Sequence, residues 1–200
     1  MKKLLLSVFA LALTVSSFAQ ISTPAASPGA KITQAVGLTE IMVDSSRPAM
    51  KGRTIFAADG LVPFGKIWRT GANGATKITF GQDAKVGGVD VKAGDYAVLT
   101  VPTAKDWTFM LYPYEGSSWG SYTEKEATAK FMGTVTKTAT TVESFTIGVN
   151  NIVDKGATID FMWENTMVSV PVAFEVHELV MANIKKEGTC SCQTKCIRVP

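Results

Sequence analysis

The residues best suited to bind a charged ligand lie in one stretch of the sequence. Three of the four arginines in the chain, Arg47, Arg53 and Arg69, fall between positions 47 and 69, whereas nearly every other positive charge is a lysine. A guanidinium group can form two parallel hydrogen bonds with a carboxylate or phosphate and can stack on an aromatic ring. The stretch also contains Trp68 and Asn73 and has no long apolar–polar alternation. We expect it to form an ordered loop, where binding sites commonly lie.

The same residues also have a structural interpretation. A long loop that crosses one end of a β domain must satisfy its backbone carbonyl groups, and arginine does this well with its five N–H donors. Ion pairs with Asp44 or Glu164 would satisfy the arginines in another way. Asn73 tolerates left-handed backbone, so it can simply form a turn. The sequence leaves the binding and structural interpretations open.

The four tryptophans divide into two pairs by their sequence context. Trp107 and Trp163 lie on the apolar side of alternating segments, which predicts that they belong to the core. Trp68 and Trp119 lie in loop-like contexts, where an indole ring can also contact a ligand. The candidate ligand-binding residues are therefore Arg47, Arg53, Trp68, Arg69, Asn73 and Trp119.

A catalytic alternative rests on Gly116-Ser117-Ser118-Trp119-Gly120, which fits the G-x-S-x-G pattern. With Asp154 and His177, Ser118 would stand in the chain order nucleophile, acid, base. Such a nucleophile lies on a sharp turn between a strand of a parallel sheet and a helix. The pattern of this sequence predicts strands without intervening helices. We therefore interpret the segment as a Gly/Ser loop and expect no catalytic residue. A hydrolase that uses Ser118 or loop carboxylates remains the alternative.

Charge and composition narrow the function classes further. The 200-residue chain has 20 Lys and Arg against 17 Asp and Glu, and a net charge of +3 gives no electrostatic footprint for nucleic acid. One histidine and the cysteines Cys190, Cys192 and Cys196 leave little for a metal site, because a closed zinc site needs four ligands. We expect no metal and no cofactor. Three cysteines leave at least one thiol free or intermolecular.

The alternation of apolar and polar residues predicts β-strands over most of the chain. Apolar residues recur at every second position in short segments such as 107–111, 145–149 and 159–163. Residues two apart fall on one face of a strand, so these strands are expected to be half-buried with one face in water. Turn signals such as Gly87-Gly88 separate the segments at about the 8–12-residue spacing of a sandwich or barrel. The predicted fold is all-β, a single antiparallel, jelly-roll-like sandwich over residues 31–176.

The ends of the chain have a different character. Lys2 and Lys3 precede an apolar run over residues 4–15, and Ser17-Phe18-Ala19 then supplies a cleavage site, which predicts a signal peptide over residues 1–19. The run is too short for the ~20 residues of a membrane span, and no cysteine for lipid attachment follows it. We expect a periplasmic or secreted protein without an integral membrane segment.

The remaining segments flank the predicted β domain. Residues 20–30 form a flexible lead-in, residues 177–188 are a possible short helix, and the cysteine-containing tail over residues 189–200 is expected to be disordered.

Four short motifs resemble one known family. They occur in the order Ser46-Arg47-Pro48, then Gly52-Arg53-Thr54-Ile55-Phe56, then a run from Leu61 to Asn73 that ends in Trp-Arg-Thr-Gly-Ala-Asn, then Ala93-Gly94-Asp95-Tyr96. Together they resemble the DUF2911 family of secreted bacterial proteins, over roughly residues 27–176. The resemblance implies a signal peptide followed by one mainly β domain. It implies no activity, so no catalytic residue is transferred.

These observations favour a non-catalytic binding module for a small polar or anionic ligand, such as a glycan or a peptide carboxylate. A hydrolase acting on the cell envelope and a structural or interaction domain are the alternatives. A pocket lined by the arginines and Trp68 would favour binding. Arginines held in ion pairs on a flat surface would favour the structural role.

Overall fold

The computed structural model describes residues 23–175 together with Val180, Met181 and Ile184. The predicted signal peptide, His177 and the cysteine tail lie outside these residues. The described chain forms one 3-10 helix, η1 (Trp119–Tyr122), and eleven strands. The strands are β1 (Gly29–Val36), β2 (Thr39–Ser46), β3 (Phe56–Ala57), β4 (Val62–Pro63), β5 (Thr76–Phe80), β6 (Ala84–Val86), β7 (Val89–Val91), β8 (Gly94–Pro102), β9 (Asp106–Pro113), β10 (Ala129–Val153) and β11 (Gly156–Phe174).

Nine strands form one sheet in the order β1-β2-β5-β8-β9-β10-β11-β6-β7, and each neighbouring pair is antiparallel. Most neighbours in the sheet are consecutive or close in sequence, because short turns join antiparallel strands. The separate pair β3–β4 is parallel. The prediction of an all-β fold is confirmed. No helix within the described part of the chain is long and apolar enough to cross a membrane.

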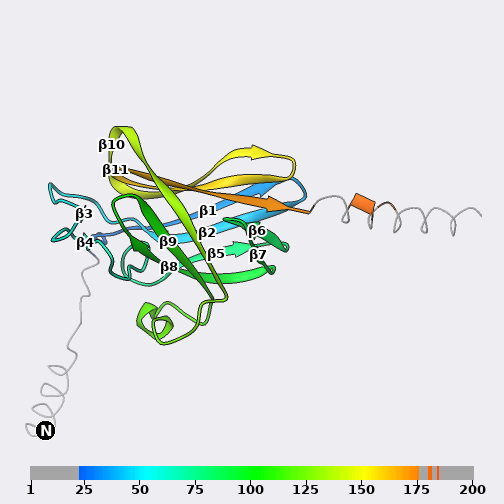
Figure 1. Ribbon diagram of the computed structural model, residues 1–200, viewed down its shortest axis with the longest axis horizontal. Coiled ribbons are helices and arrows are strands. Elements are labelled where there is room, and N and C mark those ends of the chain that lie inside the picture. The colour runs from blue at the N-terminus through cyan, green and yellow to red at the C-terminus, as the bar shows by residue number, and fades with distance from the viewer. Residues whose placement is uncertain (1–22, 176–179, 182–183, 185–200) are drawn as a thin grey trace, which may run out of the picture.

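The long β10–β11 hairpin folds back and forms the second layer of the domain. The first part of β10 pairs with β9, and the β10–β11 register then shifts beyond the Lys137–Thr166 pair. Glu164, at this irregularity, has a left-handed φ of 56°. Such bulges bend a strand, so the distal half of the hairpin lies over the sheet, as Figure 1 shows in yellow. Residues 48–50 pair with its free edge, where the Phe145 N–H donates to the Pro48 carbonyl at 2.8 Å.

The main core lies between the two layers and contains most of the aromatic side chains. Trp107 and Trp163 are 0% and 1% exposed, which confirms their predicted place in the core. Trp68 reaches the same cluster from its loop and stacks on Trp163 at 5.9 Å between centroids. Its backbone N–H donates to the Thr100 carbonyl at 2.7 Å, and the Thr100 N–H donates back at 2.8 Å. Trp68 therefore anchors the arginine-containing loop to β8.

A second apolar cluster lies on the outer face of β8 and β9. We expected that face to meet water, but it is covered by residues 114–128, which we call the cap loop. The buried members from the two strands are Ala97, Leu99, Met110 and Tyr112. Tyr122 of η1 completes the cluster, and its hydroxyl accepts from the N–H groups of Glu115 and Gly116 and donates to the Gly116 carbonyl, at 2.7–3.0 Å. The expectation of one wet face is thus wrong for these two strands.

The Gly87-Gly88 turn joins β6 to β7 as a tight hairpin. The two glycines have φ values of 57° and 87°, which match the hairpin turn that needs left-handed residues at both centres. A Cβ on Gly87 would lie 2.3 Å from the Phe131 ring, so this position also requires glycine for space. The turn predicted from the two glycines is confirmed.

Candidate functional site

The three clustered arginines have different surroundings. Arg47, directly after β2, donates from Nε to the Phe145 carbonyl at 3.0 Å and from a terminal nitrogen to Thr146 Oγ1 at 2.7 Å. Arg53 donates to two carbonyl oxygens of its own turn, at 2.9 and 2.7 Å. Arg47 therefore clamps the end of β2 to the folded hairpin, and Arg53 closes a local turn.

Arg69 has no such partners. Its Nε is buried without a hydrogen bond, and all five ion pairs among the described residues use lysine as the cation. Its terminal nitrogens form no hydrogen bond with a described residue and are not buried. The guanidinium carbon lies 5.5 Å from the centroid of the Trp119 ring. Because a desolvated charge is normally paired, a half-buried arginine without an anion marks a site where an anion would be stabilised.

The local sequence explains why Arg69 faces outward. Trp68 and Arg69 are consecutive in an extended segment, so their side chains point to opposite faces. The Trp68 ring enters the main core, and Arg69 projects to the outer face beside the second cluster. The cap loop docks there through a hydrogen bond from the Ala75 N–H to the Ser117 carbonyl at 2.9 Å. This contact brings η1, and with it Trp119, to the guanidinium group.

The turn after Arg69 holds a strained residue. Thr70 has a φ of 54°, which is unfavourable for a β-branched residue, and it is 0% exposed. Its carbonyl accepts from Thr76 Oγ1 at 2.6 Å, and its hydroxyl bonds that of Thr100 at 3.1 Å. Strained residues held by several contacts are concentrated at ligand and active sites. Thr70 thus marks the same loop as the unpartnered arginine.

The remaining predicted site residues form hydrogen bonds or packing contacts in other parts of the fold. Asn73, with a φ of 59°, donates from Nδ2 to the Ser27 carbonyl at 3.2 Å and to Ser46 Oγ at 3.1 Å. This arrangement fits the turn interpretation of Asn73. Of the six candidates, the structure brings Arg69 and Trp119 together. Trp68 packs against the core. Arg47 and Asn73 bond neighbouring segments, and Arg53 bonds its own turn.

The residues of the hydrolase alternative are spread over the fold. Ser118 is exposed at the start of η1, in the cap loop below the sheet in Figure 1. Asp154 lies in the β10–β11 turn, at the right-hand end of the upper layer. His177 lies outside the described residues. The structure therefore does not bring Ser118 and Asp154 together.

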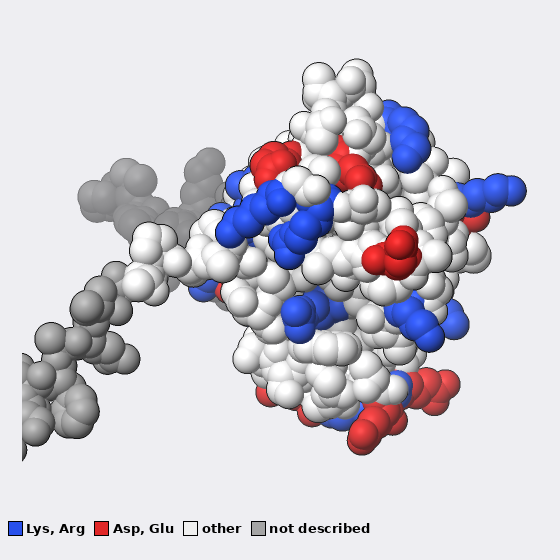
Figure 2. Space-filling view, turned by 90° about the vertical axis from the view of Figure 1, so that its left-hand side faces the viewer, with Lys and Arg blue, Asp and Glu red and all other residues white. Residues whose placement is uncertain are grey.

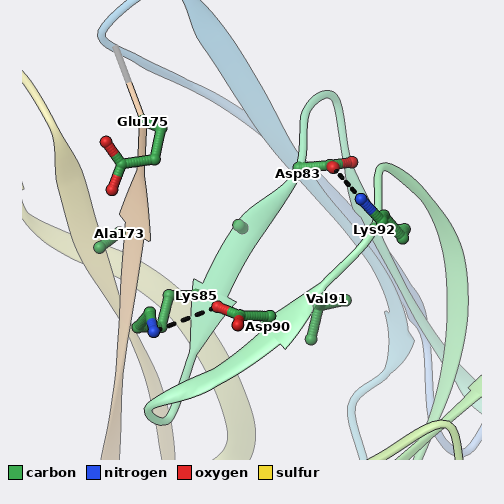
Figure 3. A pocket seen from close by; sticks show the side chains of 8 residues that line it. Asp83, Lys85, Asp90, Val91, Lys92, Ala173 and Glu175 are labelled. Atoms are coloured by element: carbon green, nitrogen blue, oxygen red, sulfur yellow. Dashed lines mark hydrogen bonds and ion pairs between the residues drawn. The ribbon is translucent and has the colours of Figure 1, made fainter. Parts of the chain in front are cut away.

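A cavity of about 340 Å³ lies between the β6–β7 hairpin and the end of β11, within the size range of small-molecule sites. Figure 3 shows its lysines paired with aspartates, Lys92 with Asp83 at 2.7 Å and Lys85 with Asp90 at 3.1 Å. Glu175 also lines this cavity (Figure 3). Since both lysines already have a counter-charge, this cavity offers no unpaired cation to an anionic ligand.

The ionisation of Asp83 also bears on catalysis at this cavity. The hydrogen bond from Lys92, and then the one from the Ala93 N–H, hold the pKa of Asp83 below its usual range. The same interaction raises the pKa of Lys92. A carboxylate that stays ionised is a poor general acid, which makes Asp83 unsuited to that role.

Surface charge is mixed on the side of the molecule that carries β3 and β4. Figure 2 shows acidic and basic side chains interspersed there, without a broad area of one sign. This pattern agrees with the low net charge of the sequence. The face shown has no continuous positive surface along which a long polyanion could bind.

Sequence reasoning missed the residues that complete the surroundings of Arg69. Thr70 was missed because no local signal predicts left-handed backbone at a threonine. Lys77 and Tyr114 were missed because Lys77 reads as an ordinary outward residue of a strand; its Nζ lies 5.4 Å from the centroid of the Tyr114 ring. Its neighbours in β5, Thr76 and Ile78, are buried, so Lys77 faces outward, and only the position of the cap loop shows what it contacts.

Comparison with known proteins gives the family. The model of DUF2911, described as a protein of unknown function, matches residues 27–172. The chain belongs to the DUF2911 family. The match runs from the start of β1 to near the end of β11 and includes Arg69 and the cap loop. Neither the curated proteins nor the solved structures contain a match.

Proposed function

We propose that this DUF2911 protein is an exported, non-catalytic binding module. Its site is formed by Arg69 and Trp119, and its ligand is a small polar or anionic molecule that presents a carboxylate, on a glycan or at the end of a peptide.

The observation that carries the proposal is the contrast among the three arginines. Arg47 and Arg53 each donate two hydrogen bonds to oxygen atoms of the protein, at 2.7–3.0 Å. Arg69 forms no such bond within the described chain, although its Nε is buried. Leaving a buried donor unsatisfied costs about 1–3 kcal/mol, so a residue selected only for stability would not favour this arrangement.

The geometry suits a carboxylate. Stacking against Trp119 limits the orientations of the guanidinium plane, while its terminal nitrogens stay accessible. A planar fork of two N–H groups matches the two oxygens of a carboxylate. Because Trp68 and Thr70 fix the backbone on either side, little conformational entropy is lost when the ligand binds.

The non-catalytic character of the proposal is supported by the surroundings of Arg69. Ser118 lies next to Trp119 in the cap loop, and its hydroxyl makes no capping hydrogen bond on η1. Its proposed acid, Asp154, lies in the other layer. Among the described residues no base forms a hydrogen bond with the Ser118 hydroxyl, and a serine that is not activated is a weak nucleophile, which favours binding over hydrolysis.

Thermal unfolding in the presence of different ligands tests the proposal, since a ligand that binds only the native state raises the midpoint. The mature chain, from Gln20, is measured with glucuronate, an acetylated dipeptide with a free carboxylate, phosphate and glucose. We expect a carboxylate to raise the midpoint, glucose to have no effect, and the increase to be lost in Arg69→Gln but kept in the matched control Arg53→Gln. No increase with either carboxylate, or an equal increase in Arg69→Gln, would contradict the proposal.

A further inference from the structure

Lys77 places a second cation beside Arg69. The Thr76 N–H points to the Arg69 carbonyl, at 3.5 Å, and Trp68 and Thr76 both pair with β8, so the segment carrying Arg69 leads directly into the position of β5. Thr76 is buried and faces inward, where its hydroxyl bonds the Thr70 carbonyl. The next residue of the strand, Lys77, therefore faces outward, on the same side as Arg69.

The cap loop contacts both cations in the same manner. Lys77 Nζ lies 5.4 Å from the Tyr114 ring centroid, and the Arg69 guanidinium lies 5.5 Å from the Trp119 ring centroid. Between these two aromatic residues, the Ser117 carbonyl accepts from the Ala75 N–H at 2.9 Å. Ser117 itself is exposed, and in sequence it lies between the two aromatic residues.

The nearby carboxylates leave part of this positive charge uncompensated. Lys77 Nζ lies 3.4 Å from Asp95 Oδ2, a long contact that uses one of its three donors. Asp95 also accepts from the Thr79 hydroxyl, and this hydrogen bond together with Lys77 lowers the pKa of Asp95. Glu115 of the cap loop is paired with Lys125. Arg69 has no described counter-charge, so the pair Arg69–Lys77 has an excess of positive charge.

Resting on the proposed function, we infer that the ligand carries two carboxylates, one bound by Arg69 and the other by Lys77, with a short spacer that passes Ser117. Trp68 bridges Thr100, and Thr76 pairs with Val98 of the same strand. Arg69 and Lys77 therefore lie about two residue steps, ~7 Å, apart along β8 and belong to one small ligand rather than to two distant sites. A second charge-assisted hydrogen bond makes a dicarboxylate of matching length bind roughly tenfold more tightly than a monocarboxylate.

A titration series tests this inference on the mature protein. Amide chemical-shift changes are followed with acetate and with linear dicarboxylates from malonate to suberate. We expect the affinity to pass through a maximum at one chain length, roughly tenfold above that of acetate. In Lys77→Met the maximum should vanish while acetate-level binding remains. Lys77→Arg should keep the maximum, as should the control Lys130→Met, which removes an exposed lysine of β10.

The outcomes separate this inference from the proposed function. Equal affinity for all chain lengths, with dependence on Arg69, would overturn the inference and leave the carboxylate site intact. A maximum that persists in Lys77→Met would also overturn it, since the second carboxylate would then be bound elsewhere. Absence of binding for every acid, acetate included, would overturn both.

Discussion

Removing the side chain of Arg47 and that of Arg69 should have opposite consequences for stability. Arg47→Met loses the hydrogen bonds to the Phe145 carbonyl and Thr146 Oγ1, which join β2 to the folded hairpin. Hydrogen bonds from a charged donor contribute about 1.5–3 kcal/mol, and partial exposure reduces that value, so we expect a loss of about 2–3 kcal/mol. In a domain of this size that corresponds to a fall in Tm of about 5–10 °C.

Arg69→Met loses only its contact with the Trp119 ring, which contributes about 0.5–1 kcal/mol. It also removes the buried Nε that lacks a partner, a donor that costs about 1–3 kcal/mol. The two effects oppose each other, so the free energy of unfolding should rise by about 0–2.5 kcal/mol.

Urea unfolding followed by tryptophan fluorescence measures both variants, because Trp68, Trp107 and Trp163 lie in one cluster of the main core. Lys31→Met, which alters an exposed lysine, serves as the control for loss of a surface charge. If Arg69→Met loses as much stability as Arg47→Met, Arg69 is a structural residue and the contrast between the arginines is refuted.

Three further predictions concern other parts of the chain. Tyr122→Phe removes a hydroxyl that bonds Glu115 and Gly116, so amide hydrogen exchange in the cap loop should accelerate while exchange in the main core stays unchanged; equal exchange in the cap loop would show that these bonds do not hold it. Ser118→Ala should leave stability and any hydrolytic signal unchanged, and fluorophosphonate labelling that is lost in this variant would instead identify a nucleophile. Protein isolated from its native compartment should begin at Gln20 by mass spectrometry, and an intact Met1 in a membrane fraction would contradict the predicted processing.

The strands could be predicted because burial imposes a period of two on them. The alternation around Trp107 and Trp163 gave both their strands and their place in the core, and Gly87-Gly88 gave the hairpin turn. The fold-back of β10 and β11 could not be predicted, because it depends on a register shift and a left-handed Glu164 that no local pattern marks. The cap loop was missed for a related reason: the apolar side chains that it covers are indistinguishable from those of a half-buried strand.

The site was predictable only in part. The clustering of arginines identified the loop that carries Arg69. Contacts between residues about a hundred positions apart, such as that of Arg47 with Phe145, decide which arginine lacks a partner. Pairing over such separations is set by the whole fold, so sequence alone left Arg47, Arg53 and Arg69 equivalent.

The affinity of Arg69→Lys for glucuronate, measured by calorimetry beside its free energy of unfolding, tests the central claim most directly. Lysine keeps the charge but lacks the planar fork, so binding should weaken by about 1–3 kcal/mol, a factor of roughly 5–150, while folding stability changes little. Unchanged affinity, or a sharp fall in the unfolding midpoint without ligand, would contradict the assignment of Arg69 to a carboxylate site.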